Sequence, residues 1–444
     1  MKNIDEQFEF RKLNALYFFQ KQIIREKRNR EKKNILYTNY FQAAFNYLVK
    51  QDYSKARESC KSLKKSCFKW LLYLEFEYYC SVFNISLPSD EDIALSFGIN
   101  TKRLKKFIKK VQEKLPTNRF VEKSYNEFIE FKNQEENYKK LPIKNIAVCA
   151  TMSAGKSTFV NALLGLDVLP ARNEATTAKI TSVYDKDKAK TLLGFVNKNK
   201  KIEEECLDAN LSIIDGWNGS SKVTRIFLQG DLDGIGNNGI IVAMHDTPGT
   251  NNSGDEAHHN VTMSFLTSQK LDALIFVANA TQLETTDEYT LLKEIFDKVV
   301  KPNNLPVIFV MNKADCIDTE KESLEIIISN YKKYLTEIGF PPPKVFTVSS
   351  KAARLLKMVL SGKETNFSEA ECDIFPSIVK KFTKRLVFDN SDDSNKNDFQ
   401  IVVDDEHYNS SVIQTALIHT GIKKIEKEIE MIVKQEDNKW QISN

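Results

Sequence analysis

The spacing of apolar residues changes once along this chain, near residue 141. Up to that point apolar residues recur at intervals of three and four, as in the run from Phe8 to Ile24, which is typical of amphipathic helices. From residue 143 onward, short apolar runs predict buried strands at Ile146–Cys149, Thr191–Val196, Lys222–Leu228, Ile240–His245, Ala273–Val277, Val307–Met311 and Val345–Val348. Helical patterns alternate with the later strands. The pattern therefore predicts an α/β fold with a mostly parallel sheet, preceded by an all-helical N-terminal domain.

Charge is divided unevenly between these two parts. Residues 1–141 hold 29 Lys and Arg against 18 Asp and Glu, whereas the remainder holds 35 against 42. A basic first part can indicate contact with nucleic acid or anionic lipid. Solvated helix faces, or docking on an acidic surface of the same chain, explain the same excess and are the simpler interpretation.

The cysteines and the N-terminus indicate a cytoplasmic protein. The 7 cysteines are scattered without a Cys-x-x-Cys pair, so neither a zinc site nor a disulfide framework is predicted. No signal peptide is recognised at the N-terminus. The most apolar window, Cys67 to Phe83, is interrupted by charges and is expected to be a buried helix. Heavy use of Lys, Asn and Ile suggests a bacterial source.

The segment from Asp90 to Val111 has the spacing of a helix-turn-helix. Small Ala94 would allow close helix packing, and Gly98 would form the turn. The second helix would carry cations suited to phosphate contacts: Lys102, Arg103, Lys105, Lys106, Lys109 and Lys110. An ordinary helical hairpin with a lysine-rich face is the simpler explanation, and both interpretations stay open here.

The first predicted strand leads into a loop and helix that match the phosphate-binding P-loop, with Ala150 where the pattern has its first glycine. Backbone N–H groups in such a loop surround the β- and γ-phosphates at a helix N-terminus, where the helix dipole favours an anion. Gly155 would let the backbone come close, Lys156 would neutralise phosphate charge, and Ser157 would give its hydroxyl to Mg²⁺. The predicted nucleotide-binding residues of this loop are Met152, Ser153, Ala154, Gly155, Lys156, Ser157 and Thr158.

Two further segments are expected near the terminal phosphate. Thr177, with Thr176 in reserve, would reach Mg²⁺ through its hydroxyl and hold the attacking water through its backbone carbonyl. Asp246 follows the strand Ile240–His245 and would bind the Mg²⁺ shell, while Gly249 would donate its N–H to the γ-phosphate. The predicted metal-binding residues are therefore Ser157, Thr177 and Asp246.

The base-recognition elements come last. A carboxylate at Asp315 can accept hydrogen bonds from both N1–H and the 2-amino group of guanine, a donor pair that adenine lacks. Asn312 would tie this loop to the P-loop, and Lys313 would cover the base with its alkyl stem. Ser350 and Lys351, after the strand Val345–Val348, would contact the base as well. These elements, in this order, predict a P-loop GTPase domain with GTP as substrate.

Several of these segments resemble the dynamin superfamily, most closely bacterial dynamin-like proteins. The resemblance covers roughly Ile143 to Ala353 and rests on Ser153-Ala154-Gly155-Lys156-Ser157, Leu169-Pro170 with Thr176-Thr177, and Asp246-Thr247-Pro248-Gly249. It implies that Ser153 helps to neutralise charge on the bridging oxygen between the β- and γ-phosphates. The expected catalytic residues are then Ser153, Lys156 and Thr177. The resemblance also implies a homodimer formed through two G domains, whose contact raises activity.

The expected domains are a helical region at 1–141, a GTPase domain at 142–353, a polar flexible loop at 354–410 and a closing helix at 411–436. Because few residues follow that helix, the stalk helices and lipid-binding tip usual in dynamins are not expected in this sequence. A membrane surface to which the protein is peripheral, or a partner dynamin-like chain, stays possible as a partner. The alternative is a GTP-dependent switch whose basic N-terminal helices bind DNA or a protein.

Overall fold

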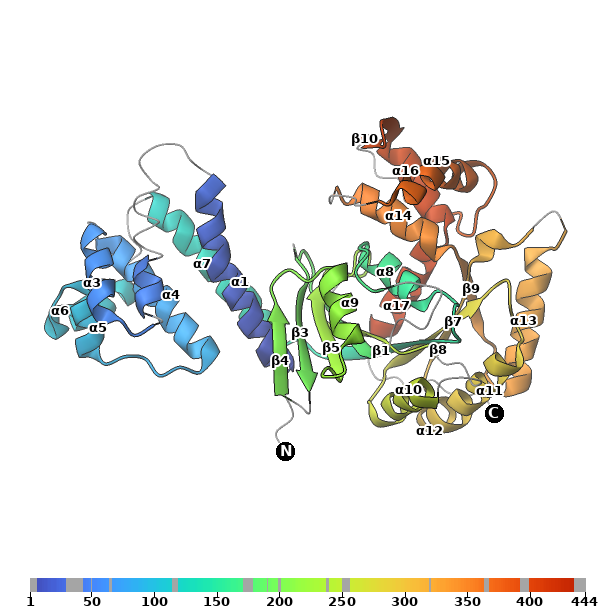
Figure 1. Cartoon of the computed structure of the whole chain (residues 1–444), viewed down its shortest axis with the longest axis horizontal. Coiled ribbons are helices and arrows are strands. Elements are labelled where there is room, and N and C mark those ends of the chain that lie inside the picture. Colours follow the sequence, from blue (N-terminus) through green and yellow to red (C-terminus); the bar gives the residue numbers. More distant parts are fainter. Residues whose placement is uncertain are drawn as a thin grey trace. The chain divides into compact units, whose positions relative to one another are not determined.

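The computed structural model describes residues 6–28, 43–48, 50–63, 66–113, 119–170, 179–189, 191–198, 201–236, 239–249, 256–318, 321–362, 367–391 and 399–434. The chain divides into two compact units, Met1–Leu141 and Pro142–Asn444 (Figure 1). Within the described ranges, no helix combines the length and the apolar character needed to cross a bilayer.

The described residues of the first unit contain helices and no strand, as the apolar spacing predicts. The helices are α1 (Glu6–Arg28), α3 (Tyr53–Ser62), α4 (Ser66–Phe83), α5 (Asp90–Phe97), α6 (Thr101–Glu113) and α7 (Arg119–Tyr138), and residues 43–48 are helical as well. Aromatic side chains fill their common core: Phe19 stacks on Phe45, and Trp70 packs against Tyr125. Aromatic packing, which buries large apolar areas, therefore contributes to holding the unit together.

Helices α5 and α6 have the turn that the sequence indicates. Gly98 ends α5 with a φ of 63°, a left-handed conformation that glycine adopts without strain. Ala94 and Leu104 are buried between the helices. The exposed face of α6 carries Lys102, Arg103, Lys105, Lys106 and Lys109. A lysine-rich face on a packed hairpin fits both interpretations, so DNA binding stays a prediction.

The second unit is built on one sheet with the strand order β4-β3-β5-β2-β6-β1-β7-β8-β9 (Figure 1). Strands β6, β1, β7, β8 and β9 are parallel, and antiparallel pairs join β2 to β6, β3 to β5 and β4 to β3. The bounds are β1 (Ile143–Ala150), β2 (Ile180–Asp185), β3 (Leu193–Lys198), β4 (Lys201–Cys206), β5 (Arg225–Gly230), β6 (Ile241–Asp246), β7 (Ala273–Asn279), β8 (Val307–Asn312) and β9 (Lys344–Val348). All seven predicted strands occur within a few residues of the expected bounds, and β2 and β4 are additional.

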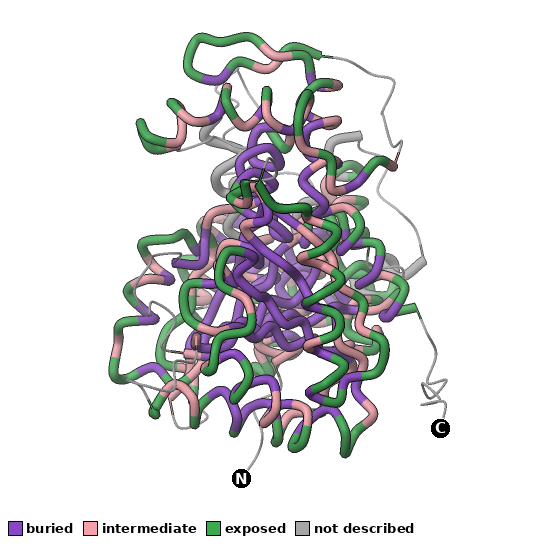
Figure 2. Tube along the Cα trace, turned by 90° about the vertical axis from the view of Figure 1, so that its right-hand side faces the viewer, coloured by how far each residue is buried: buried purple, intermediate pink, exposed green. Residues whose placement is uncertain are grey.

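Helices cover both faces of this sheet, and the alternation of side chains in β1 decides which core each residue joins. Ile146 and Val148 belong to the core under α8 (Lys156–Leu164), α9 (Leu211–Gly219), α14 (Ser350–Leu360), α15 (Glu369–Lys384), α16 (Ser410–His419) and α17 (Ile422–Lys434). Ala147 and Cys149 belong to the core under α10 (Glu256–Ser268), α11 (Thr286–Ile295) and α13 (Leu324–Ile338). Short helical segments lie at Phe296–Val300, Lys301–Asn303 and Ala314–Cys316. The buried residues concentrate in the sheet and the helix faces against it (Figure 2).

The C-terminal segment corrects two predictions. The flexible loop expected at 354–410 is wrong for most of its length, because α14 extends to Leu360, α15 follows, and β10 (Gln400–Val403) pairs with β11 (Glu406–Asn409). Helix α15 forms because Ser368 and Glu371 make a capping box and three apolar residues line its buried face: Phe375, Val379 and Phe382. Residues 392–398 lie outside the described residues.

The closing helix expected at 411–436 is two helices, α16 and α17. They are separated at Gly421, whose φ is +86°. A Cβ atom there would lie 2.2 Å from the carbonyl oxygen of Thr347 at the end of β9, so only glycine allows this approach.

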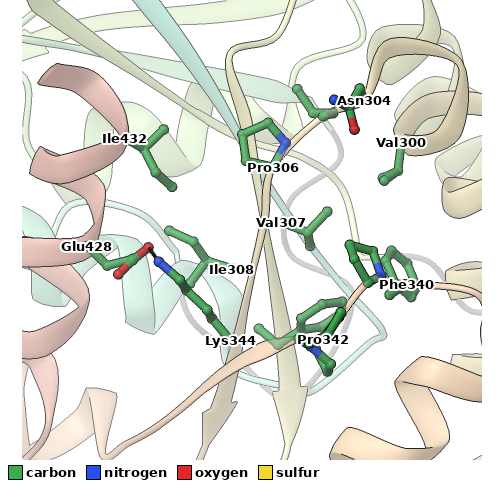
Figure 3. A pocket seen from close by; sticks show the side chains of 14 residues that line it. Val300, Asn304, Pro306, Val307, Ile308, Phe340, Pro342, Lys344, Glu428 and Ile432 are labelled. Atoms are coloured by element: carbon green, nitrogen blue, oxygen red, sulfur yellow. Dashed lines mark hydrogen bonds and ion pairs between the residues drawn. The ribbon is translucent and has the colours of Figure 1, made fainter. Parts of the chain in front are cut away.

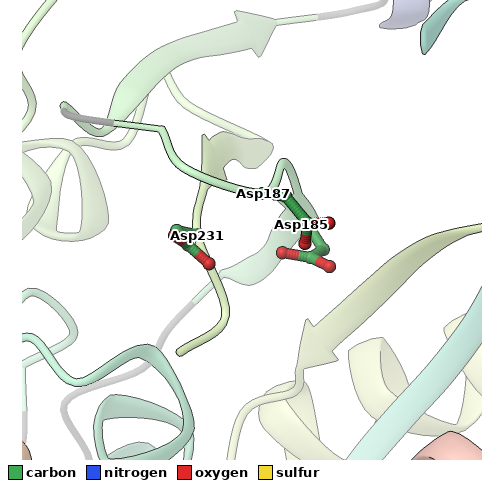
Figure 4. A group of neighbouring side chains, drawn as sticks. All are labelled: Asp185, Asp187 and Asp231. Carbon is green, nitrogen blue, oxygen red and sulfur yellow. The ribbon is translucent and has the colours of Figure 1, made fainter. Parts of the chain in front are cut away.

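Three carboxylates gather where β2 and β5 end: Asp185, Asp187 and Asp231 (Figure 4). Asp185 is buried, and burial raises its pKa to about 8. Its Oδ1 accepts a 2.9 Å hydrogen bond from the backbone N–H of Leu232. At neutral pH this side chain is therefore mainly a neutral acid, which is a poor ligand for a cation.

Replacing Asp185 with asparagine is expected to stabilise the second unit at pH 8 but not at pH 4. In the wild type the folded state keeps a proton that the unfolded state has already lost, so stability falls by about 1.4 kcal/mol per pH unit between the two pKa values. Asparagine cannot ionise and keeps the acceptor for Leu232. Urea unfolding of both proteins from pH 4 to pH 9 measures the difference. A difference that does not change over this range would contradict a protonated Asp185.

Candidate nucleotide-binding site

The P-loop lies between β1 and α8. Ala150 ends β1 and does not have a positive φ. Alanine can therefore occupy the position of the first glycine without strain. Gly155 caps α8 with a φ of 83°. A Cβ atom on it would lie 2.4 Å from the Nδ2 atom of Asn312, so a side chain there would force the two loops apart. The loop is therefore packed directly against the segment after β8.

Lys156, Ser157 and Asp246 form the buried centre of the site. The Lys156 ammonium makes an ion pair with Asp246 Oδ1, and the Ser157 hydroxyl donates a 3.1 Å hydrogen bond to Asp246 Oδ2. All three residues are at least nine-tenths buried. A buried carboxylate is stable only with such partners, so the end of β6 is fixed against the start of α8.

The residues after Asp246 continue along the P-loop. The Thr247 hydroxyl donates a 2.8 Å hydrogen bond to the Val148 carbonyl of β1. The Thr262 hydroxyl of α10 donates a 3.1 Å bond to the carbonyl of Pro248. At Gly249 a Cβ atom would lie 3.6 Å from the Cα of Met152, so this backbone is adjacent to the P-loop. The structure thus brings Gly249 and Met152 together, as expected for one phosphate site.

Asn312 joins three loops through one side chain. Its Nδ2 donates a 2.8 Å hydrogen bond to the carbonyl of Ala154, and its Oδ1 accepts a 3.1 Å bond from the N–H of Ser350. Next to it, Lys313 has a φ of 61°, and its ammonium donates a 2.8 Å bond to the carbonyl of Ser153. The P-loop and the loops after β8 and β9 are therefore held in one arrangement.

Asp315 lies in the short helical turn Ala314–Cys316, among three lysines from separate elements. The ammonium of Lys381 on α15 donates a 2.6 Å hydrogen bond to the Asp315 carbonyl. The pKa of the neighbouring Cys316 thiol is raised, mainly by burial. The nearby charges of Lys381, Lys313 and Lys351 oppose this shift. The turn is thus surrounded by positive charge.

Some predicted residues cannot be located. Thr176 and Thr177 lie outside the described residues, as do residues 250–255. After that gap, His259 of α10 is partly buried, and its Nε2 lies 2.8 Å from Glu294 Oε2 of α11.

Sequence reasoning missed the role of Asn161. Its side chain accepts a 2.9 Å hydrogen bond from the N–H of Leu169 and donates a 2.8 Å bond to the carbonyl of the same residue. It thereby fixes the chain that leads from α8 toward residue 171. The signal in the sequence is an asparagine within an otherwise apolar run, Phe159 to Leu164, and the structure shows this asparagine fully buried.

Arg354 was also missed. It is buried on α14 and makes ion pairs with Asp167, at 2.8 Å, and with Glu371 of α15. It therefore links α15 to the same connection that Asn161 fixes.

The donor set at the start of α8 fits a magnesium ion. Mg²⁺ prefers hard oxygen ligands such as hydroxyls and carboxylates, and the Ser157 hydroxyl and Asp246 carboxylate lie side by side here. When bound, Mg²⁺ supplies positive charge to the phosphate oxygens. The lysine ammonium and the N-terminus of α8 would add to it.

An apolar pocket lies at the opposite end of the strands (Figure 3). It is lined at the starts of β8 and β9 by residues that include Pro306, Val307 and Phe340, and by Ile432 of α17. Lys344 and Glu428 form a 2.6 Å ion pair among its lining residues. No predicted site residue lines this pocket, so it is separate from the candidate nucleotide site.

The central parallel strands, the P-loop at the carboxyl end of β1 and the linked loops after β6, β8 and β9 define a P-loop GTPase domain. Residues 146–314 match the model of the dynamin family. Within the second unit, this stretch is similar to the dynamin family.

Comparisons with individual proteins cover larger parts of the chain. An uncharacterized protein in the xynA 3′ region of Caldicellulosiruptor sp. (strain Rt8B.4) is 27% identical over 294 residues, which are 65% of this chain and 63% of that protein. A chain of an oligomerised bacterial dynamin pair is 18% identical, with a TM-score of 0.38 over 72% of this chain and 55% of that chain. Aquifex aeolicus Era bound to GDP and aluminium fluoride is 21% identical, with a TM-score of 0.28 over 56% and 70%. The chain thus spans less than two thirds of the length of the curated relative.

Proposed function

We propose that this chain binds GTP together with Mg²⁺ and hydrolyses it at the site formed by the P-loop and the loops after β6, β8 and β9. The observation that supports this most strongly is the side chain of Asn312, which bonds to Ala154 on one side and Ser350 on the other. A single amide thereby links the expected phosphate site to the expected base site. The match of residues 146–314 to the dynamin family supports the same function.

In this proposal the phosphates lie at the N-terminus of α8. Lys156 neutralises charge on the β- and γ-phosphates, and Ser157 and Asp246 hold Mg²⁺. Ser153 is exposed at the tip of the P-loop with a φ of 60°, where it is suited to face the bridging oxygen. Thr177 would orient the attacking water. Catalysis then consists of positioning and charge stabilisation.

Guanine would lie between the loops after β8 and β9. Asp315 accepts hydrogen bonds from N1–H and the 2-amino group, while Lys313 and Lys351 flank the base. The backbone of Ser350 is already fixed by Asn312. A base without these two N–H donors would leave the Asp315 carboxylate without its hydrogen bonds. ATP is therefore expected to be a poor substrate.

We further propose that two G domains associate face to face during the reaction, with or without a membrane surface. Purified protein is expected to hydrolyse GTP at a specific rate that rises with protein concentration and rises further with anionic liposomes. The physical reason is mass action: association of two chains increases with concentration, and a surface that binds the chains concentrates them. Phosphate release over a range of protein concentrations measures this.

The controls separate the parts of this proposal. Liposomes of zwitterionic lipid at equal lipid concentration test whether charge is needed, and ATP in place of GTP tests base selection. A specific rate that is independent of concentration would contradict dimerisation, and the chain would then act as a monomeric switch. No turnover under any of these conditions would contradict hydrolysis.

A further inference from the structure

Helix α15 reaches the base-recognition turn from a distant part of the chain. Lys381 lies near the C-terminal end of this helix, 66 residues after Asp315. Its ammonium donates a 2.6 Å hydrogen bond to the carbonyl of Asp315 and lies 4.0 Å from Oδ2 of the same residue. One lysine therefore contacts both the backbone and the carboxylate of the residue expected to bind guanine.

Packing and an ion pair fix the position of α15, and with it the backbone of Lys381. Phe375 and Phe382 of α15 are fully buried in the core beneath the helix. Near the other end, Glu371 makes an ion pair with the buried guanidinium of Arg354. A helix held by packing along one face and by an ion pair at its start cannot easily move its lysine away from the turn.

This contact bears on the direction of the Asp315 carboxylate. Recognition of guanine requires both carboxylate oxygens to face two adjacent N–H groups, so a small rotation of the turn would misalign the pair. The hydrogen bond from Lys381 restrains the carbonyl of Asp315. At 4.0 Å from Oδ2 the ammonium attracts the carboxylate without the short contact that would block a ligand.

We propose that Lys381 is a positioning residue for guanine recognition, which holds Asp315 in the orientation that accepts the 2-amino group. This inference rests on the proposed function, in which Asp315 binds the base. Lys381 acts through Asp315 and does not need to touch the nucleotide. Helix α15 would thus contribute to nucleotide selection even though it lies outside the predicted motifs.

The test compares GTP with inosine triphosphate, which lacks only the 2-amino group. Equilibrium affinities of both nucleotides with Mg²⁺ are measured for the wild type and for Lys381→Met, which keeps an unbranched side chain of nearly the same length but removes the ammonium. The wild type is expected to prefer GTP. The variant is expected to lose about fivefold to tenfold of that preference, because a weakened hydrogen bond to a charged group is worth this much. Its affinity for inosine triphosphate should change by less than about twofold.

Two further variants sharpen the result. Lys381→Arg keeps the cation and should restore most of the preference for GTP. Lys380→Met alters the preceding, exposed lysine of the same helix and should leave both affinities unchanged. Preservation of the wild-type ratio in Lys381→Met would overturn the inference. Equal weakening of both nucleotides would also overturn it, since a purely structural role predicts that outcome.

Asp315→Ala distinguishes failure of this inference from failure of the proposed function. If the wild type prefers GTP and Asp315→Ala removes the preference while Lys381→Met keeps it, only the role of Lys381 is wrong. If the wild type shows no preference, or Asp315→Ala leaves it intact, then base recognition by Asp315 is wrong and the inference is overturned with it.

Discussion

Replacing Lys156 with alanine is expected to abolish GTP turnover, with a loss of at least about 100-fold in rate. The ammonium is buried at the N-terminus of α8, where the phosphates are expected to bind. Its removal takes away charge stabilisation that water cannot replace at a buried site. Steady-state phosphate release and equilibrium GTP binding measure the two components separately.

Lys344→Ala is the matched control for this variant. Lys344 begins β9 at the opposite end of the sheet, where it pairs with Glu428, so its loss should leave turnover unchanged. Because Lys156→Ala also leaves Asp246 without its cation, thermal unfolding must be measured to confirm that the variant is folded. Full activity in folded Lys156→Ala would contradict the proposed nucleotide site.

Replacing Lys357 with methionine is expected to destabilise the second unit by about 3–5 kcal/mol. Lys357 is fully buried on α14, pairs with Glu426 of α17 and donates a 3.3 Å hydrogen bond to the carbonyl of Leu163 in α8. Without it, a carboxylate that is 2% exposed keeps Lys423 as its one cationic partner among the described residues. Urea unfolding with pulsed hydrogen–deuterium exchange measures the effect, since peptides report each unit separately.

Two comparisons test the cause of that loss. The double variant Lys357→Met and Glu426→Leu removes both charges and should recover much of the stability. Lys434→Met breaks a surface pair with Glu430 on α17, so it should cost less than about 1 kcal/mol. Equal losses for Lys357→Met and Lys434→Met would contradict a special role for the buried pair.

The clearest strand in the sequence is one whose buried residues are almost all apolar. All of β7 is buried and apolar except its last residue, so its apolar run is unambiguous. β2 escapes prediction because its buried positions include Ser182 and Asp185, which are stabilised by partners elsewhere in the fold. Ser182 accepts a 2.9 Å hydrogen bond from Arg225, a contact that exists only once the strands have paired. Local pattern cannot reveal such partners.

The same distinction separates the parts of the candidate site. Residues at or shortly after the ends of strands, such as Lys156, Asp246 and Asn312, could be named because parallel strands bring their carboxyl ends to one edge. Lys381 could not be named, because its relation to Asp315 depends on how an unexpected helix packs. Charged positions in the segment 354–410 suggested solvent exposure, yet the apolar face of α15 includes Phe375 and Phe382 and pulls the helix onto the core.

The two hydrogen bonds made by the Asn312 amide, one through Nδ2 and one through Oδ1, affect the entropy of nucleotide binding. The P-loop and the loops after β8 and β9 lose their independent motion when the chain folds, since one buried side chain bonds to two of them. The conformational entropy of these loops is therefore already lost before a nucleotide arrives, and binding need not lose it again. In an Asn312→Ala variant, the loops would lose this conformational entropy when the nucleotide binds and not when the chain folds.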